Sequence, residues 1–158
     1  MKTLLVYTTR HGCAEKCARE IEKGLRGEVK LVNLKKEKLN TFTDYDTVIV
    51  GGSIHAGKIQ KKISDFCQKN LDTLKVKKLG LYLCCMEEGE KAQQQFDNAF
   101  PTDLIEHATA TAIMGGEFDF ERMNFLERAI IRKIAQVDHS ISKVSPEQIA
   151  AFIEKINN

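Results

Sequence analysis

Short apolar runs separated by amphipathic stretches set the strongest constraint on what this chain can fold into. Residues 3–7, 47–50 and 79–85 are rich in branched and aromatic side chains, as is typical of strands that are buried on both faces. Between these runs, apolar residues recur every three or four positions, which predicts helices that cover a sheet. Because strands and helices alternate along the chain, the sequence predicts an α/β fold with a parallel sheet between helices.

The same patterns place the individual elements. A helix is expected over residues 13–25, with Gly27 as its stop signal. The clearest helix start is Ser145, the predicted N-cap, followed by Pro146 at the first helical position and Gln148 placed to complete a capping box. The remaining elements are expected at residues 29–32 and 108–114 (strands) and at residues 59–67, 93–100 and 125–134 (helices).

Length and charge narrow the class of protein. The 158 residues contain no repeat and no linker, so we expect a single domain over residues 1–158. Lys and Arg total 24 against 22 Asp and Glu, and this net charge of +2 argues against nucleic acid as a partner. No apolar run is long enough to span a bilayer or to form a signal-peptide core, so a cytoplasmic location is expected.

The five cysteines are expected to be reduced in that compartment. There is no Cys-x-x-Cys pair and no such pair repeated at zinc spacing, so no metal site is expected.

The turn after the first strand, Thr8 to Ala14, is suited to an anion. The N-terminus of the following helix presents unpaired N–H groups and a partial positive charge, which stabilise a phosphate. Thr9 can donate a further hydrogen bond, and Gly12 lets the backbone approach closely. The other interpretation is a plain turn whose threonine caps the helix.

Two later turns would lie at the same edge of the sheet, where ligands bind in open parallel sheets. In the segment Gly51 to Gly57, three glycines flank Ser53 and His55, which indicates a loop that lies against a flat ligand. A merely flexible turn is the alternative. In the segment Cys84 to Gly89, soft sulfur side chains could border an aromatic ring, although core packing is the simpler role.

These segments carry a resemblance to a known family. The first turn resembles the FMN phosphate loop of flavodoxins, whose pattern is Thr/Ser-x-Thr/Ser-Gly-x-Thr. The segment Gly51 to Gly57 is similar to the Gly-Ala-Ser-Ile-Arg-x-Gly loop of a narrower branch, the menaquinone-dependent protoporphyrinogen IX dehydrogenases. Residues 115–120, leading into 124–132, are similar to that branch's last strand and following helix, so the resemblance covers nearly the whole chain.

The resemblance implies a flavodoxin-like fold, namely three layers around a doubly wound, five-stranded parallel sheet of order 2-1-3-4-5. It implies FMN as cofactor, with the first turn on the phosphate and the other two beside the isoalloxazine ring. The implied cofactor-binding residues are Thr8, Thr9, Arg10, His11, Gly12, Cys13, Ala14, Ser53, Ile54, His55, Ala56, Gly57, Cys84, Cys85 and Met86.

Two positions depart from the phosphate-loop pattern. Ala14 replaces the last hydroxyl, which leaves only a backbone N–H for that contact, and His11 replaces the second hydroxyl, where it could donate to phosphate instead. The chain has no Trp, so His55, Met86 or one of the Tyr and Phe residues is left to cover the ring.

Other residues have two interpretations each. Cys13 could be a reactive thiol at a helix N-terminus, but a neighbouring phosphate would oppose the thiolate, and a packed side chain is favoured. Cys84 and Cys85 could form a vicinal disulfide or pack at the end of a strand. Residues 118–132 mix apolar side chains with arginines, so this segment either touches a membrane surface or packs on the sheet, and packing is favoured.

Three functions stay open. The first is an FMN oxidoreductase of the protoporphyrinogen dehydrogenase type, with a porphyrinogen as donor and a quinone as acceptor at the inner face of a membrane. The second is a flavodoxin-type electron carrier without a substrate of its own, and the third is a non-redox binding domain that has lost FMN. Flavodoxin carriers are characteristically acidic, so the net charge of +2 favours the enzyme over the carrier.

Overall fold

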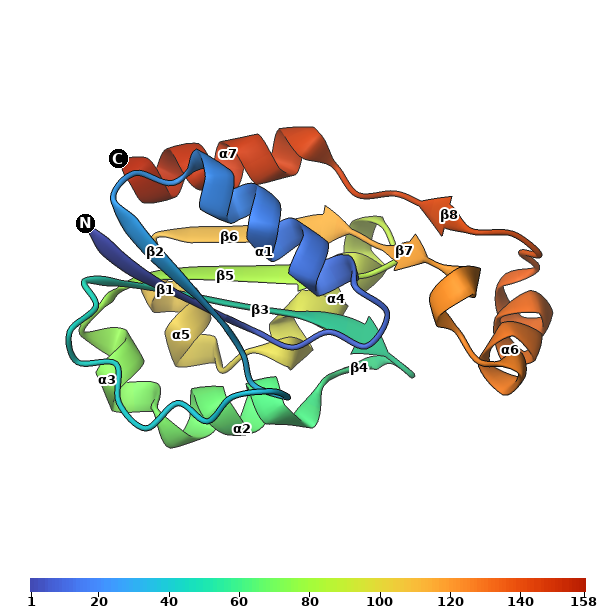
Figure 1. Cartoon of the computed structure of the whole chain (residues 1–158), viewed down its shortest axis with the longest axis horizontal. Helices are drawn as coiled ribbons and strands as arrows, with labels where there is room; N and C mark the ends of the chain where they lie inside the picture. The colour runs from blue at the N-terminus through green and yellow to red at the C-terminus, as the bar shows by residue number, and fades with distance from the viewer.

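Five parallel strands form the central sheet of the computed structural model, which describes residues 1–158 (Figure 1). Their spatial order is β2-β1-β3-β5-β6, which is the expected order 2-1-3-4-5 when the parallel strands alone are counted along the chain. A short additional strand, β4 (Lys58–Ile59), pairs antiparallel with the end of β3. The parallel strands are β1 (Lys2–Tyr7), β2 (Glu28–Asn33), β3 (Thr47–His55), β5 (Lys78–Cys84) and β6 (Ala110–Gly115).

Helices cover both faces of this sheet. On one face, alternate residues such as Leu5 and Ile49 pack against α1 (Cys13–Gly24) and α7 (Pro146–Asn157). The other face, which includes Leu4, packs against the remaining sheet-covering helices. Those helices are α2 (Lys61–Lys69), α3 (Leu71–Lys75), α4 (Gly89–Ala99) and α5 (Thr102–His107), of which the short α3 and α5 were not predicted.

The start of α7 confirms the predicted N-cap but not the capping box, because the Ser145 N–H donates to the Met114 carbonyl and not to the Gln148 side chain. Ser145 is the N-cap residue, its hydroxyl accepts a hydrogen bond from the Gln148 N–H at 3.2 Å, and Pro146 occupies the first turn. This bond satisfies an N–H that has no partner inside the helix, which fixes where the helix begins.

The expected loop over Gly51 to Gly57 is wrong in its first part. β3 continues through His55, and only Ala56 and Gly57 form the turn. Gly51 serves packing, because a Cβ at this position would lie 1.9 Å from ring atoms of the buried Tyr82. The Tyr82 hydroxyl in turn donates to the Ala14 carbonyl at 2.9 Å, so the glycine lets the ring lie across β3 and reach α1 on the same face of the sheet.

The last large departure from prediction is the segment of residues 117–143, here called the excursion. It leaves β6, forms β7 (Glu117–Phe118), a 3₁₀ turn (Phe120–Arg122), α6 (Phe125–Ala135) and β8 (Ile141–Ser142), and returns to α7. Its two ends are adjacent, since the Lys143 N–H donates to the Gly116 carbonyl at 2.8 Å.

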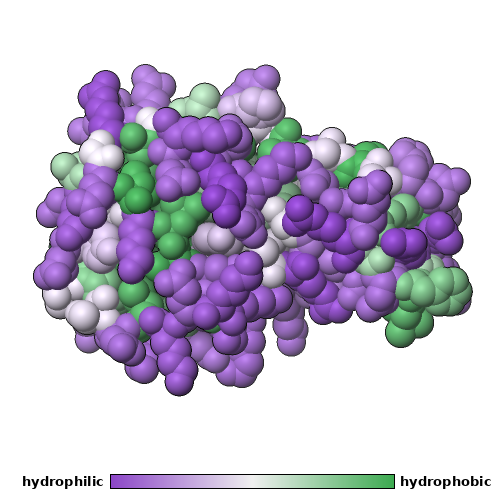
Figure 2. All heavy atoms as spheres, in the orientation of Figure 1, coloured by the Kyte–Doolittle hydropathy of each residue, from purple (hydrophilic) through white to green (hydrophobic).

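Helix α6 does not pack on the sheet, contrary to the favoured interpretation of residues 118–132. It projects from the end of the molecule, and none of its residues is buried (Figure 1). Phe125 is 84% exposed and Ile134 is 76% exposed, and Figure 2 shows apolar side chains gathered on the part of the surface that carries α6. The amphipathic stripe of α6 therefore faces a cavity and solvent, whereas the sequence pattern alone predicted that it packs on the sheet.

Candidate functional site

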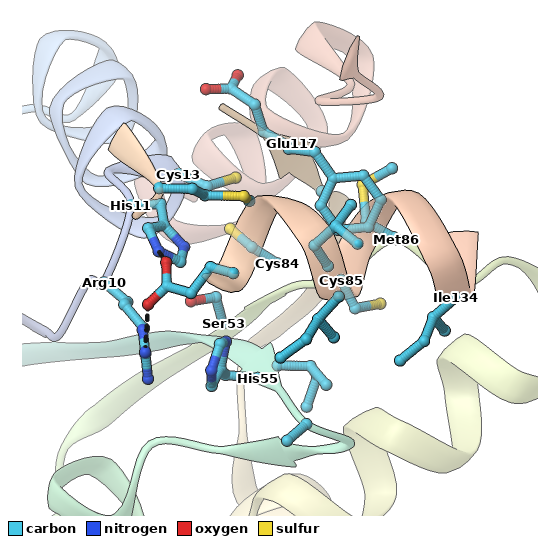
Figure 3. A pocket seen from close by; sticks show the side chains of 18 of the residues that line it. Arg10, His11, Cys13, Ser53, His55, Cys84, Cys85, Met86, Glu117 and Ile134 are labelled. Atoms are coloured by element: carbon cyan, nitrogen blue, oxygen red, sulfur yellow. Dashed lines mark hydrogen bonds and ion pairs between the residues drawn. The ribbon is translucent and has the colours of Figure 1, made fainter. Parts of the chain in front are cut away.

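A cavity of about 520 Å³ opens at the carboxyl edge of the sheet, between the strand ends and α6 (Figure 3). This volume lies within the usual range for small-molecule sites. Ten of the fifteen predicted cofactor residues line it. They are Arg10, His11, Cys13, Ser53, Ile54, His55, Ala56, Cys84, Cys85 and Met86.

The other five predicted residues lie outside the cavity wall. Thr9 is structural within the loop, since its hydroxyl accepts from the Gly12 N–H at 2.8 Å. Ala14 is fully buried in the core, and Gly57 is exposed in the turn after β3. Thr8 is fully buried, and its hydroxyl has no hydrogen-bond partner.

The backbone of the first turn has the shape expected for an anion loop. Gly12 has φ +99°, a left-handed conformation, and directly precedes α1. Helix α1 therefore begins at the end of this turn, which also contains the buried, unpartnered hydroxyl of Thr8. The Arg122 guanidinium of the excursion lies over this turn, since a Cβ on Gly12 would stand 2.1 Å from one of its nitrogens.

A carboxylate already lies against Arg10 and His11 of this loop. The side chain of Glu127, from α6, accepts from the Arg10 guanidinium with one oxygen and contacts His11 Nε2 at 2.7 Å with the other. Arg10, followed by His11, lowers the pKa of Glu127 to about 2. The loop therefore accommodates an anion, and a phosphate fits the same donors that the carboxylate uses.

The opposite end of the cavity is apolar. Figure 3 shows Arg10, His11 and His55 at one end, and Met86 and Ile134 at the other. Burial, followed by the charge of Arg10, lowers the pKa of His55, which favours its neutral imidazole form. A flat ring system fits the cavity between these two ends, with His55 on the polar side and Met86 on the apolar side of its lining.

Two hydrogen bonds between Gln60 and Ser53 fix the end of β3 that carries Ser53. The Gln60 amide donates to the Ser53 hydroxyl at 2.8 Å and accepts from the Ser53 N–H at 3.0 Å. Gln60 belongs to the connection between β4 and α2, so the β3–β4 hairpin holds this wall of the cavity in place.

Sequence reasoning missed the wall that the excursion supplies. The mixture of apolar and arginine side chains in residues 118–132 marked this segment as unusual, but it did not reveal that the segment faces the site. The missed lining residues are Gly116, directly before the excursion, and, within it, Glu117, Phe118, Met123, Asn124, Leu126, Glu127, Ile130, Ile131 and Ile134.

All five cysteines are buried free thiols. Cys84 and Cys85, at the end of β5, point in different directions: the Cys84 sulfur lies 3.6 Å from that of Cys17, while Cys85 lies 3.7 Å from the Glu87 carbonyl. Burial raises the pKa of Cys85. The packed interpretation of this pair therefore describes the structure.

Comparisons with known proteins agree with this architecture. Among solved structures, a short-chain flavodoxin associated with a non-canonical PDU bacterial microcompartment is 17% identical, with a TM-score of 0.59 over 99% of this chain and 97% of that one. A Streptococcus pneumoniae TIGR4 flavodoxin (13% identity, TM-score 0.59, 99% and 95% coverage) and an oxidised flavodoxin 1 from Bacillus cereus (15%, 0.57, 99% and 95%) are similar in the same way. At these identities the likeness concerns the fold, and no curated protein matches the chain.

The family model described as "Flavodoxin domain" matches residues 4–144, which is most of the chain and includes all three predicted cofactor segments. The protein therefore belongs to the flavodoxin domain family.

Proposed function

We propose that this protein is an electron carrier that uses FMN bound in the cavity at the carboxyl edge of its sheet. The family assignment supports FMN, the cofactor of flavodoxins, which they bind at the point where strand order reverses. The observation that carries the proposal is the pairing of an anion loop with an apolar pocket in one cavity of about 520 Å³.

In this proposal the two ends of the cavity bind different parts of FMN. The N-terminus of α1, with Arg10 and His11, holds the phosphate by charge-assisted hydrogen bonds. Ser53 to Ala56 and Cys84 to Met86 hold the ring system and exclude water from it. Bound FMN supplies the electron transfer itself, so the protein contributes position and electrostatics.

A second candidate is an FMN oxidoreductase that resembles the quinone-dependent protoporphyrinogen IX dehydrogenases. The family comparisons do not extend to this branch. What favours the candidate is the excursion, because Leu126, Ile130 and Ile134 of α6 give the cavity an apolar wall that could hold an apolar substrate. The net charge of +2 also fits a docking carrier poorly.

Three experiments separate these possibilities. The purified protein should be yellow and should release FMN on denaturation; a colourless protein that takes up no added FMN would leave only the non-redox binding domain. The loaded protein should then pass electrons from a reductase to cytochrome c. Anaerobic oxidation of protoporphyrinogen IX with a menaquinone analogue, faster than with free FMN, would instead establish the enzyme.

We also propose that α6 makes a peripheral contact with an anionic membrane. No helix of the protein is long and apolar enough to cross a bilayer. The exposed face of α6 nevertheless combines Phe125 and Ile134 with the cations Arg132 and Lys133, and this combination suits an interfacial helix at anionic lipid.

Vesicle sedimentation tests this contact. The protein should bind phosphatidylglycerol vesicles and not phosphatidylcholine vesicles, and Phe125→Glu should abolish the binding without unfolding the domain. Val76→Glu is the matched control, because Val76 is an equally exposed apolar residue (79%) outside the excursion. Equal binding by both variants would refute the role of α6.

A further inference from the structure

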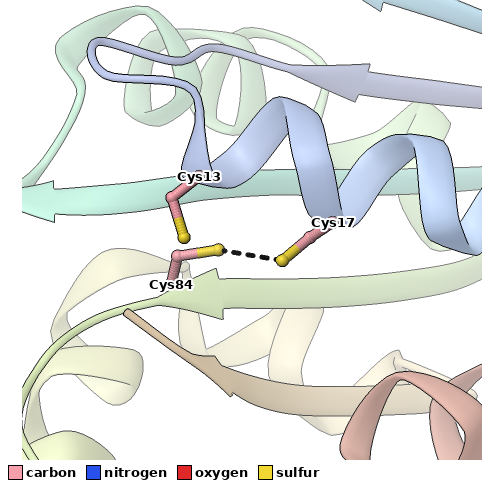
Figure 4. A group of neighbouring side chains, drawn as sticks. All are labelled: Cys13, Cys17 and Cys84. Atoms are coloured by element: carbon pink, nitrogen blue, oxygen red, sulfur yellow. Dashed lines mark hydrogen bonds between the residues drawn. The ribbon is translucent and has the colours of Figure 1, made fainter. Parts of the chain in front are cut away.

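Three thiols from two elements converge beside the cavity. Cys13 and Cys17 lie one turn apart on α1, and Cys84 ends β5 (Figure 4). Their sulfur atoms all lie within 4.8 Å of one another, and those of Cys17 and Cys84 are 3.6 Å apart. Three sulfurs bound to one ion at about 2.3 Å would stand about 4 Å apart, so the fold already holds them near ligand spacing.

The number of these sulfur ligands and their chemical softness limit which ion the cluster can bind. No His, Asp or Glu joins the three sulfurs at this spacing, whereas a structural zinc site takes four ligands. Thiolate sulfur selects soft ions. The cluster therefore favours a soft ion with a coordination number of three.

Burial limits the charge of the complex. The exposed fractions of Cys13, Cys17 and Cys84 are 8%, 0% and 1%, and Lys16, the cation of the first turn of α1, is paired with Glu117 at 3.1 Å. Three thiolates around a monovalent copper ion would leave two negative charges in this apolar setting, which is costly without a partner. A trivalent centre bound to three thiolates is neutral and avoids that cost.

We propose that Cys13, Cys17 and Cys84 form a binding site for trivalent arsenic, taken up as arsenite. Three S–H bonds and three As–O bonds break, three As–S bonds form, and the released hydrogens leave with the hydroxyl groups as three waters. Arsenic stays trivalent, and no electrons are exchanged. Arsenite reaches the sulfurs from the cavity, because Cys13 and Cys84 are part of its lining.

Native mass spectrometry of the purified protein, reduced with a phosphine under anaerobic conditions and mixed with sodium arsenite, tests the site. The expected adduct adds one arsenic atom and loses three hydrogens. Arsenic K-edge X-ray absorption of the same sample should report three sulfur neighbours and no oxygen. This measurement needs no variant, so it stands even if a substitution in the core prevents folding.

Substitutions then assign the ligands. Cys13→Ser, Cys17→Ser and Cys84→Ser should each abolish the adduct that lacks three hydrogens. Cys67→Ser and Cys85→Ser are matched controls and should keep it, because Cys67 is buried in the opposite core and Cys85 is adjacent to Cys84 but outside the cluster. No adduct in the wild-type protein, a centre with an oxygen neighbour, or a complete adduct that survives Cys17→Ser would overturn the proposal. None of these outcomes depends on FMN.

Discussion

At the scale of single residues, Glu127 is the side chain that most affects the predicted phosphate loop. It comes from α6, more than a hundred positions along the chain from the loop, and its two oxygens engage Arg10 and His11. A phosphate that uses these donors must displace this carboxylate or accept it as a like-charged neighbour. Glu127 therefore weakens phosphate binding in either geometry.

Glu127→Gln should tighten FMN binding about fivefold at low salt, the equivalent of about 1 kcal/mol of relieved competition and repulsion. Quenching of FMN fluorescence on titration with apoprotein measures the dissociation constant. Glu106→Gln, on the exposed surface of α5, is the control and should leave it unchanged. Unchanged or weaker binding by Glu127→Gln would show that the phosphate does not use Arg10 and His11.

The same substitution should show a defined pH dependence in the apoprotein. The pKa of Glu127 falls from its ordinary value of 4.5 to about 2 in the folded protein, first because Arg10 donates to it. Its contribution to stability is therefore present above pH 4.5 and is lost as the pH falls toward 2. The melting-temperature difference between wild type and Glu127→Gln should shrink over this interval, and a constant difference would contradict the pairing.

Gly51 illustrates a residue whose role is steric. Gly51→Ala should destabilise the domain by about 3 kcal/mol or more, because the new methyl group overlaps the Tyr82 ring and displaces its hydrogen bond to Ala14. Gly57→Ala is the control: its surroundings are open and only its φ of +78° is strained, so about 1–2 kcal/mol is expected. Urea unfolding measures both, and equal losses would argue against the steric role.

At the scale of elements, the excursion is attached to a central sheet that is complete without it. The Ser145 N–H donates to the Met114 carbonyl, and Lys143 bonds to Gly116, so the chain re-enters α7 beside the point where it left β6. The two largest cores contain no residue of the excursion. Its own buried side chains, Phe120 and Met123, pack locally.

Replacing residues 117–142 with an Asn-Gly turn should therefore leave the domain folded, because the sheet and its two cores stay intact. Far-UV circular dichroism and a single cooperative thermal transition check this. Loss of the transition would show that the excursion is part of the fold. The shortened protein should also lose binding to anionic vesicles.

Sequence patterns predicted those elements whose signals are local. The buried strands, α1 and the Ser145 cap of α7 follow from side-chain period and capping chemistry. The extension of β3 through Gly51 does not, because the ring of Tyr82 that requires the glycine lies on another strand. The position of α6 was wrong for a related reason, since an apolar stripe has the same spacing whether it covers a sheet or a cavity.

At the scale of the whole molecule, cofactor binding and folding are linked. The cavity is built from the ends of β1, β3 and β5 together with α6, so unfolding disperses every one of its walls. A ligand that binds only the folded protein then stabilises all of it, in proportion to the logarithm of ligand concentration.

FMN at about 100 times its dissociation constant should stabilise the domain by about 2.7 kcal/mol and raise its melting temperature by about 5–10 °C. Differential scanning calorimetry with and without FMN measures the shift. Riboflavin, which lacks the phosphate, should give a smaller shift at equal concentration. Equal shifts would show that the loop from Thr8 to Ala14 adds nothing to binding.

The hydrogen bond that joins Lys143 to Gly116 has a consequence for how this protein can evolve. Because this bond holds Gly116 and Lys143 together, insertions, deletions and substitutions in the residues between them leave the register of the sheet unchanged. Selection on a partner or a surface can therefore act on residues 117–142 almost independently of selection for a foldable domain. Among descendants of this chain, we expect divergence to be fastest in that interval.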